Sequence, residues 1–138
     1  MGCPPPEPTL TPQMKEYAFT MYYLCLSSAV GGKAGATWVR NIVTTPITDT
    51  YTFINFNYSP VNMPSAVANG EVVWADDSVT LVTTGTITFT SDILGLKSIA
   101  PDFSGPSGGV PPTAGVITIN DIDVPVAEFV AWAATLTP

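Results

Sequence analysis

Histidine is absent from this chain of 138 residues, and only four residues are basic: Lys15, Lys33, Arg40 and Lys97. Histidine is the commonest general base and the commonest imidazole ligand for metals, so Ser–His and Cys–His dyads are excluded. The basic residues are scattered and form no cationic patch, which argues against a nucleic-acid partner. We therefore expect a protein that is not an enzyme and that holds no cofactor.

Cysteine is also scarce, with Cys3 and Cys25 as its two occurrences. Two cysteines are too few for a disulfide framework. Cys25 lies in the apolar run 17–26 and is expected to be a buried thiol. A Cys3–Cys25 disulfide, or a bridge between subunits, is the alternative that the spacing leaves open.

Charged residues make up 11% of the chain, with a net charge of −7, against about 25% charged residues in a typical soluble domain. The acidic balance repels nucleic acid and anionic membranes. The longest apolar run, 17–30, is interrupted by Thr20 and two serines and falls short of the ~20 residues of a spanning helix. It follows a proline-rich stretch, which is a poor start for a signal peptide. We expect no membrane partner and synthesis in the cytoplasm of a host cell.

Threonine alternates with aliphatic and aromatic residues in several segments. In residues 84–90, period-2 alternation puts Ile87 and Phe89 on one face and Thr86, Thr88 and Thr90 on the other. Threonine fits a pleated sheet without adding charge. The pattern predicts half-buried antiparallel strands, with a wet face that carries hydroxyl groups.

Further strands are expected at 36–44, 50–58, 71–75, 78–83, 115–120 and 122–126. The aromatic segment 50–58 should place Tyr51 and Phe53 on one face and Ile54, Phe56 and Tyr58 on the other. Segment 17–26 is apolar on both faces and is expected to be a covered strand, with a helix as the alternative. The tail 127–136 could be a short helix or an edge strand.

Turn residues separate these segments. Turns are expected at Asn69-Gly70, at Asp76-Asp77 and across Asn120-Asp121, and a long Gly/Pro loop at 101–115. Seven to nine short strands at this spacing predict an all-β fold, an antiparallel β-sandwich or jelly roll, in a single domain spanning 14–138.

Residues 1–13 hold five prolines, among them Pro4, Pro5, Pro6 and Pro8, and are expected to form an extended arm with polyproline character. Ordering such an arm costs about 1–2 kcal/mol per residue, so an ordered arm needs a partner surface. These four prolines, with Leu10, Phe129 and Trp132, are our candidates for a partner interface.

Two further candidates for binding sites are weak. Asp121 and Asp123 share one face of an extended chain and with Asn120 resemble part of a calcium site, but calcium needs six to eight oxygen ligands. An acidic turn is the favoured interpretation, and no metal is predicted. The three tryptophans, Trp38, Trp74 and Trp132, could stack on a carbohydrate, although core and interface positions are commoner for this residue.

These observations favour a structural subunit of a large symmetric assembly over an enzyme, because scarce charge suits surfaces buried in symmetric contacts. The threonine-rich, histidine-free, acidic composition is similar in style to decoration (cement) proteins of tailed-phage capsids. That resemblance implies a virion protein, with further copies of itself and/or a major capsid-type protein as partners. The alternatives are a carbohydrate- or cell-surface-binding module and a fimbrial or tail-type subunit that exchanges strands through its arm.

Overall fold

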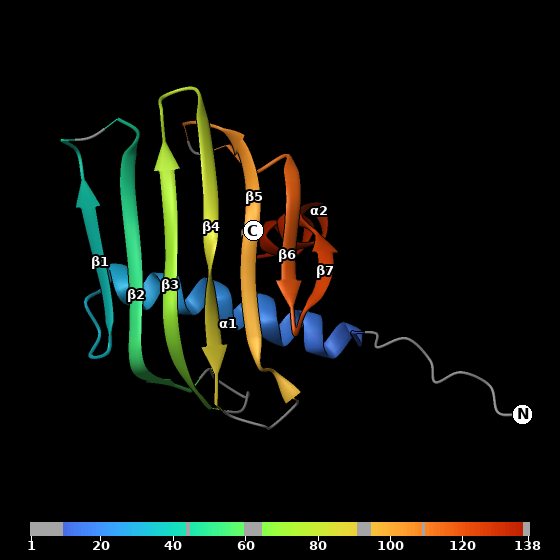
Figure 1. The fold of residues 1–138 in the computed structure, drawn as a ribbon. Coiled ribbons are helices and arrows are strands. Elements are labelled where there is room, and N and C mark those ends of the chain that lie inside the picture. Colours follow the sequence, from blue (N-terminus) through green and yellow to red (C-terminus); the bar gives the residue numbers. More distant parts are fainter. Residues whose placement is uncertain (1–9, 44, 60–64, 91–94, 109, 137–138) are drawn as a thin grey trace, which may run out of the picture.

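The structure, a computed structural model, describes residues 10–43, 45–59, 65–90, 95–108 and 110–136. These residues form one seven-stranded antiparallel sheet with a helix before it and a helix after it (Figure 1). The elements are α1 (Pro12–Val30), β1 (Ala36–Asn41), β2 (Ile47–Tyr58), β3 (Ala66–Asp76), β4 (Thr80–Phe89), β5 (Ser98–Pro106), β6 (Ala114–Ile119), β7 (Ile122–Pro125) and α2 (Val126–Ala134). Strand order in the sheet follows the chain, from β1 to β7.

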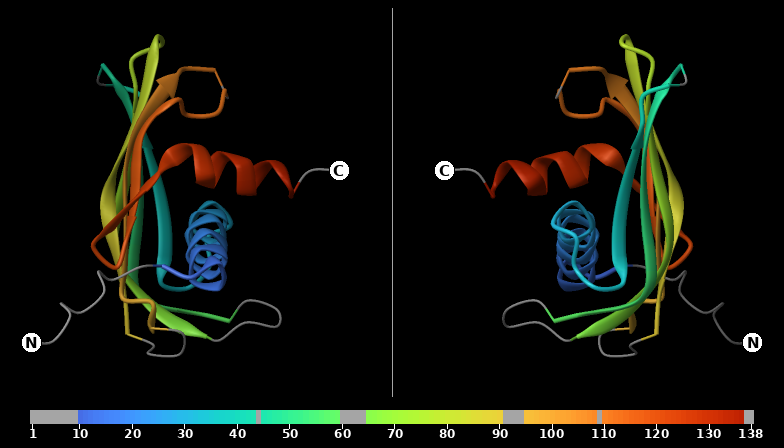
Figure 2. Two further views of the ribbon diagram at one scale, coloured as in Figure 1. Left: turned by 90° about the vertical axis from the view of Figure 1, so that its right-hand side faces the viewer. Right: turned by 90° about the vertical axis from the view of Figure 1, so that its left-hand side faces the viewer.

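Both helices lie on the same face of the sheet, α1 across the strands and α2 beside α1 (Figure 2). The predicted antiparallel β architecture is confirmed. The predicted β-sandwich or jelly roll is not confirmed, because in the described residues the layer that packs on the sheet is built from helices rather than from a second sheet. The result is a two-layer domain with one covered sheet face.

The expectation of a strand at 17–26 was wrong, and the helical alternative is confirmed. Thr11 caps α1 by accepting a hydrogen bond from the Met14 amide at 3.1 Å, and Pro12 occupies the first turn. The buried positions recur at helical spacing, with Ala18, Tyr22, Cys25 and Ala29 on one side of α1. Five further residues of this helix are also buried: Tyr17, Phe19, Met21, Leu26 and Ser28. The sheet and α2 together bury so much of α1 that its sequence is apolar on most sides.

Pro12 and Gln13, the last two residues of the expected arm, belong to α1. Residues 1–9, with Pro4, Pro5, Pro6 and Pro8, lie outside the described residues.

A β-bulge changes the expected faces of β2. The pairing with β3 shifts between Phe53 and Phe56, where Asn55 has a φ of 48°. The extra residue returns Phe56 to the buried face that Tyr51 and Phe53 occupy, and Ile54 is left exposed. Strict alternation was thus correct up to Phe53 and wrong beyond it.

Asn69-Gly70 lies inside β3 rather than in a turn. The Asn69 side chain accepts a hydrogen bond from the Asn55 amide at 2.8 Å and so fastens the bulge of β2. Gly70 has a φ of +134°, and a Cβ there would lie 2.1 Å from the carbonyl oxygen of Thr86 on β4. Asn69 thus bonds to β2, and Gly70 allows β3 and β4 to approach closely. Such an approach requires glycine as much as a turn does.

The expected loop at 101–115 is mostly strand, with β5 reaching Pro106 and β6 beginning at Ala114. Proline is rare in central strands because it lacks an amide N–H. Pro101 is tolerated because the β4–β5 pairing is interrupted near it: pairs are formed up to Thr84↔Asp102 and resume at Ile87↔Ile99. Residues 107–113 are left to connect the two strands β5 and β6.

Two turn predictions are confirmed. Asp77 Oδ1 accepts hydrogen bonds from the amides of Val79 (2.9 Å) and Thr80 (2.7 Å) between β3 and β4. These bonds hold the pKa of Asp77 below its usual value. Asn120 and Asp121, both with positive φ, join β6 to β7 in a two-residue hairpin.

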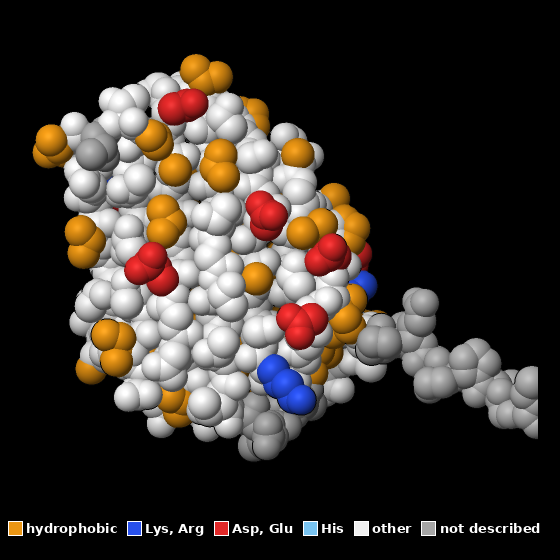
Figure 3. Space-filling view, viewed as in Figure 1, with side chains coloured by type: hydrophobic (Ala, Val, Ile, Leu, Met, Phe, Trp, Pro, Cys, Tyr) orange, Lys and Arg blue, Asp and Glu red, His pale blue; other side chains and the backbone are white. Residues whose placement is uncertain are grey.

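The alternating threonines of residues 84–90 lie as predicted. Ile87 and Phe89 are buried under the helices, and Thr86, Thr88 and Thr90 are exposed on the opposite face. Figure 3 views this helix-free face, on which acidic and basic side chains are sparse and single hydrophobic side chains are spread between polar ones. A seven-stranded sheet therefore presents a broad and mostly uncharged surface.

Candidate functional site: an aromatic cleft and an open sheet edge

A cleft of about 850 Å³ lies between the two helices and the sheet. The C-terminal half of α1 supplies Tyr22, Tyr23, Leu26 and Val30; α2 supplies Phe129, Val130 and Ala133; the sheet supplies Tyr51, Trp74, Leu81, Thr83 and Phe103. None of the described residues that line it carries a charge. Its size and its aromatic walls are those of ligand and peptide sites.

The cleft holds polar hydrogens that lack an acceptor. The Tyr22 hydroxyl and the Trp74 indole Nε1 are buried atoms that make no hydrogen bond within the described residues, and Tyr22 is only 1% exposed. Burial raises the pKa of Tyr22, and the neighbouring Trp74 indole opposes part of that rise. Even an indole N–H directed at the Tyr22 oxygen would leave the Tyr22 O–H without an acceptor. A buried donor left unpaired costs about 1–3 kcal/mol.

One rim of the cleft is the connection between β5 and β6, which contributes Val110, Pro111 and Pro112. This connection is held to the β3–β4 turn, because the Ser107 hydroxyl donates to Asp76 Oδ1 at 2.7 Å and the Ser107 amide donates to the Val79 carbonyl oxygen at 3.0 Å. The rim is therefore supported by the sheet rather than by its own contacts alone.

The second feature is the edge of the sheet at β1, which pairs only with β2 in the part of the chain that the structure describes. Val39 on this strand is 63% exposed, and Ile42 and Val43, which follow it, are 70% and 92% exposed. The opposite edge, β7, has four residues and ends in Pro125. Short strands and proline protect an edge from pairing, and exposed apolar residues invite it.

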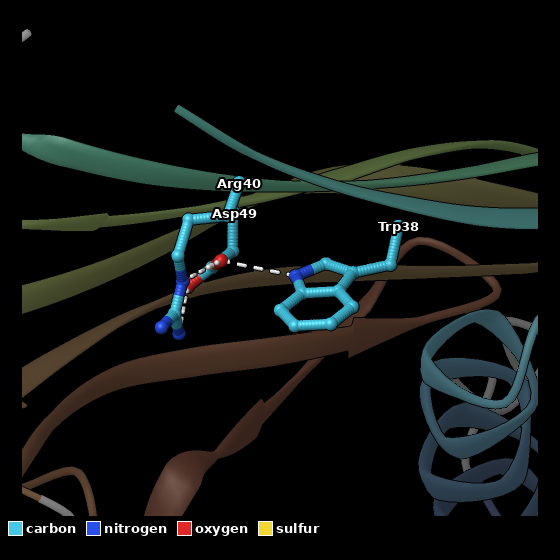
Figure 4. Close-up of polar contacts among 3 residues, drawn as sticks. All are labelled: Trp38, Arg40 and Asp49. Carbon is cyan, nitrogen blue, oxygen red and sulfur yellow. Dashed lines mark hydrogen bonds and ion pairs between the residues drawn. The ribbon is translucent and has the colours of Figure 1, made fainter. Parts of the chain in front are cut away.

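Three side chains fasten β1 to β2 on the helix side (Figure 4). Asp49 Oδ1 accepts hydrogen bonds from Trp38 Nε1 (3.0 Å) and Arg40 Nε (2.8 Å), and Asp49 Oδ2 accepts from Arg40 Nη2 (3.2 Å). The guanidinium also lies 5.5 Å from the centre of the Trp38 ring. Hydrogen bonding to Asp49 raises the pKa of Arg40. The charge nearest the exposed edge is thus already paired within the chain.

The partner-interface candidates of the C-terminal tail contact α1 in the described structure. Phe129 packs edge-on against Phe19 (5.4 Å between ring centres) and Tyr22 (5.5 Å), and Trp132 lies 5.7 Å from Phe19. Lys15 joins the helices through a 2.8 Å ion pair with Glu128. Phe129 and Trp132 are only partly buried, and Phe129 forms part of the cleft wall. Leu10, just before α1, packs against the core.

The weak metal candidates are not brought together as a ligand set. Asp121 lies in the β6–β7 turn, and Asp123 accepts a hydrogen bond from the Thr118 hydroxyl at 2.8 Å. The Asn120 side chain accepts from the amides of Lys97 and Ser98 and donates to the Gly95 carbonyl oxygen. The described residues contain no group of three or more acidic or sulfur ligands.

Cys25 is a free, fully buried thiol, as expected. Burial raises its pKa to about 12. Cys3, its predicted alternative partner, lies outside the described residues.

The three tryptophans contact three different sets of neighbours. Trp38 joins Arg40 and Asp49, Trp74 packs against Tyr51 (5.4 Å), and Trp132 packs on the helices. A sugar platform would need their rings on one surface.

Comparisons of the chain with protein-family models, with curated proteins and with solved structures found no match. No helix within the described ranges combines the length and the apolar character needed to cross a membrane. The fold and the two surfaces define a mainly β domain with an aromatic cleft and an open edge.

Sequence reasoning missed the cleft, because it depends on α1 being a helix. The spacing of Ala18, Tyr22, Cys25 and Ala29 and the Thr11-Pro12 start were the signals that could have revealed it. The exposed residues that follow β1 were visible in the sequence, but their exposure depends on β1 lying at the edge.

Proposed function

We propose that this chain is a non-enzymatic structural subunit that assembles with copies of itself into a large symmetric structure, of the kind that decoration proteins form on phage capsids. The observation that carries the proposal is the open β1 edge, with Val39, Ile42 and Val43 exposed. An edge strand presents unpaired backbone groups to any chain that can add a strand.

Pairing of β1 with β1 of a second copy suits this edge best. It gives an isologous two-fold contact, in which the same residues face each other on both subunits. The Arg40 charge is held by Asp49 and is therefore not brought unpaired into the contact. Pairing of β1 with β7 is disfavoured because β7 is short and ends in Pro125.

The broad helix-free face supports the same function. Its threonine hydroxyls are soluble, yet they cost less to desolvate than lysine or glutamate side chains would. Such a face can contact a shell-type partner or solvent.

The test compares Val39→Lys with the matched control Val79→Lys. Both substitutions add one positive charge at an exposed valine, 63% and 75% exposed, but Val79 lies in the β3–β4 turn. We expect the unsubstituted chain to self-associate in sedimentation velocity, and Val39→Lys to raise the dissociation constant at least about tenfold, equivalent to roughly 1.4 kcal/mol. Val79→Lys should leave it unchanged.

A chain that remains monomeric at about 100 μM, a concentration at which even a weak specific contact would be populated, contradicts the proposal. Equal effects of the two lysines would contradict the role of β1.

A further inference from the structure

We propose that the aromatic cleft is the docking site for the proline-rich N-terminal segment, residues 4–8, of a second copy of this chain. This inference rests on the proposed function and deepens it by naming a second contact between subunits. The inference rests on one match: the cleft lacks hydrogen-bond acceptors, and the segment supplies them.

The cleft has hydrogen-bond donors without acceptors, at the Tyr22 hydroxyl and the Trp74 indole. The segment Pro4-Pro5-Pro6-Glu7-Pro8 has the opposite imbalance, because proline retains its carbonyl oxygen and lacks an amide N–H. Each proline carbonyl is an acceptor that no N–H of a neighbouring proline can satisfy. Because both polar atoms are buried in the described structure, docking would pair donors and carbonyl oxygens after a small shift of the Tyr22 and Trp74 side chains.

The cleft walls also suit a polyproline helix. Recognition of such segments uses grooves lined with aromatic rings, between which the proline rings pack. The lining rings that keep accessible surface are Tyr23, which is 47% exposed, and the partly buried Trp74 and Phe129. With three residues per turn, Pro5 and Pro8 fall on one ridge of the segment, which is the spacing of P-x-x-P ligands.

The charge of Glu7 and the uncharged cleft lining agree with a segment whose Pro5 and Pro8 face the cleft. In a polyproline helix Glu7 lies on a different ridge from Pro5 and Pro8 and points away from the surface on which they pack. The described lining of the cleft is uncharged, so it can accept the apolar ridge without burying an unpaired carboxylate.

The segment is too short to fill the cleft of its own chain. Leu10 packs against the core at the start of α1, whereas the cleft begins at Tyr22, about 15 Å further along the helix from Pro12, and extends to Val30, about 27 Å away. Pro5 and Pro8 precede Leu10 by five and two residues, so an extended polyproline chain carries them only about 6–16 Å back. The segment can therefore fill the cleft of a neighbour but not its own.

Strand addition of this segment to β1 is the competing mode. Prolines cannot donate to a ladder, so residues 4–8 would leave the carbonyl groups of the edge without partners. The cleft needs acceptors rather than donors, which is why we assign the segment to it.

The two contacts differ in symmetry. A β1–β1 contact closes as a two-fold dimer, whereas an arm from one copy in the cleft of the next is heterologous and continues from subunit to subunit. Together they would convert dimers into a larger array.

The experiment uses the native Cys3, one residue before the proline segment, as the attachment point for a benzophenone maleimide. Cys25 is buried, which directs the reagent to Cys3. Equal amounts of ¹⁴N- and ¹⁵N-labelled full-length chains are mixed, labelled and irradiated, and crosslinked peptides are sequenced by mass spectrometry. We expect crosslinks of mixed isotope content from residue 3 to the second half of α1, to α2 or to 110–112.

Two variants test the hydrogen bonds. Tyr22→Phe and Trp74→Phe each remove a donor and keep an aromatic ring, and each should lower the crosslink yield roughly five-fold, as expected for the loss of one buried hydrogen bond. Tyr58→Phe is the matched control, because it also removes a hydroxyl and keeps an aromatic ring, but Tyr58 packs on Phe56 outside the described lining of the cleft, and it should leave the yield unchanged. Thermal melts of all three variants check that they are folded.

The outcomes separate the two proposals. Three results would overturn the docking site: crosslinks within one chain, crosslinks to residues 36–41, or a crosslink yield that neither Tyr22→Phe nor Trp74→Phe changes. If the chain nevertheless sediments as an assembly, the proposed function stands. A chain that sediments as a monomer and gives no crosslinks between copies would overturn both.

Discussion

Single residues decide the shape of this sheet at points where strands approach closely. Gly85 on β4 has a φ of +137°, and a Cβ there would lie 2.2 Å from the Glu71 carbonyl oxygen and 2.7 Å from the Val72 Cα. Both atoms belong to the backbone of β3 and cannot move without disturbing the ladder. The glycine is needed for its missing side chain as much as for its φ.

Gly85→Ala should lower the free energy of unfolding by about 2–3 kcal/mol, the combined effect of an unfavourable φ and an overpacked contact. Gly108→Ala is the control, because Gly108 also has a positive φ (+100°) but would place its Cβ in open space. It should cost about 1 kcal/mol, from the backbone conformation alone. Urea unfolding of both variants measures the difference, and equal losses would show that the β3 contact contributes nothing.

Buried ionisable residues set the response to alkali. Burial raises the pKa of Cys25 and of Tyr51 to about 12, from ordinary values of 9.0 and 10.0. Both groups stay neutral in the folded chain while the unfolded chain ionises above pH 9–10. Their contribution is therefore complete below pH 9 and is lost as the pH rises towards 12.

We expect the free energy of unfolding to change little from pH 7 to 9 and then to fall, by up to about 1.4 kcal/mol per pH unit for each ionising group. Urea unfolding at a series of pH values measures this, and Cys25→Ala should shift the start of the fall upward from pH 9 towards 10. Stability that is constant from pH 9 to 11 would contradict the burial of these groups.

At the scale of the elements, sequence patterns predicted the strands better than the helix. Alternation in 84–90 was reliable because Ile87 and Phe89 need cover on one side only. It failed in 50–58 at the bulge, which depends on Asn69 of another strand and is invisible to local periodicity. Helix α1 was predicted as a strand because the sheet and α2 both cover it, which leaves few polar residues to mark a helical face.

The candidate site was predictable only in part for the same reason. The tail residues Phe129 and Trp132 were singled out, and Phe129 does line the cleft. Trp74 was named only as a possible carbohydrate-stacking residue and Tyr22 was not named as a site residue, because the two meet across two elements whose packing the sequence does not display.

The β1 edge depends on its anchor to β2. Asp49→Asn should loosen β1, because it removes the charge that holds Arg40 and leaves a neutral acceptor for Trp38. Trypsin should then cut after Arg40 several-fold faster, while cleavage after Lys33, which precedes β1, serves as the internal reference and stays constant. Unchanged cleavage after Arg40 would mean that the cluster does not hold the edge.

At the scale of the molecule, four features agree with a chain that forms contacts with other subunits: scarce charge, a helix-free sheet face, an aromatic cleft and an open sheet edge. The core is complete on one side of the sheet, where α1 and α2 bury it. The surfaces that remain carry few charges and many threonine hydroxyls, and they cost less to desolvate than lysine or glutamate side chains would.

The most direct test of assembly through β1 is amide hydrogen exchange of the full-length chain at low and high protein concentration. We predict that the peptide containing residues 36–41 becomes more protected as the concentration rises, while the β3–β4 turn peptide containing residues 77–79 does not change. Exchange of residues 36–41 that is independent of concentration, in a chain that sedimentation shows to be a monomer throughout, would contradict the account.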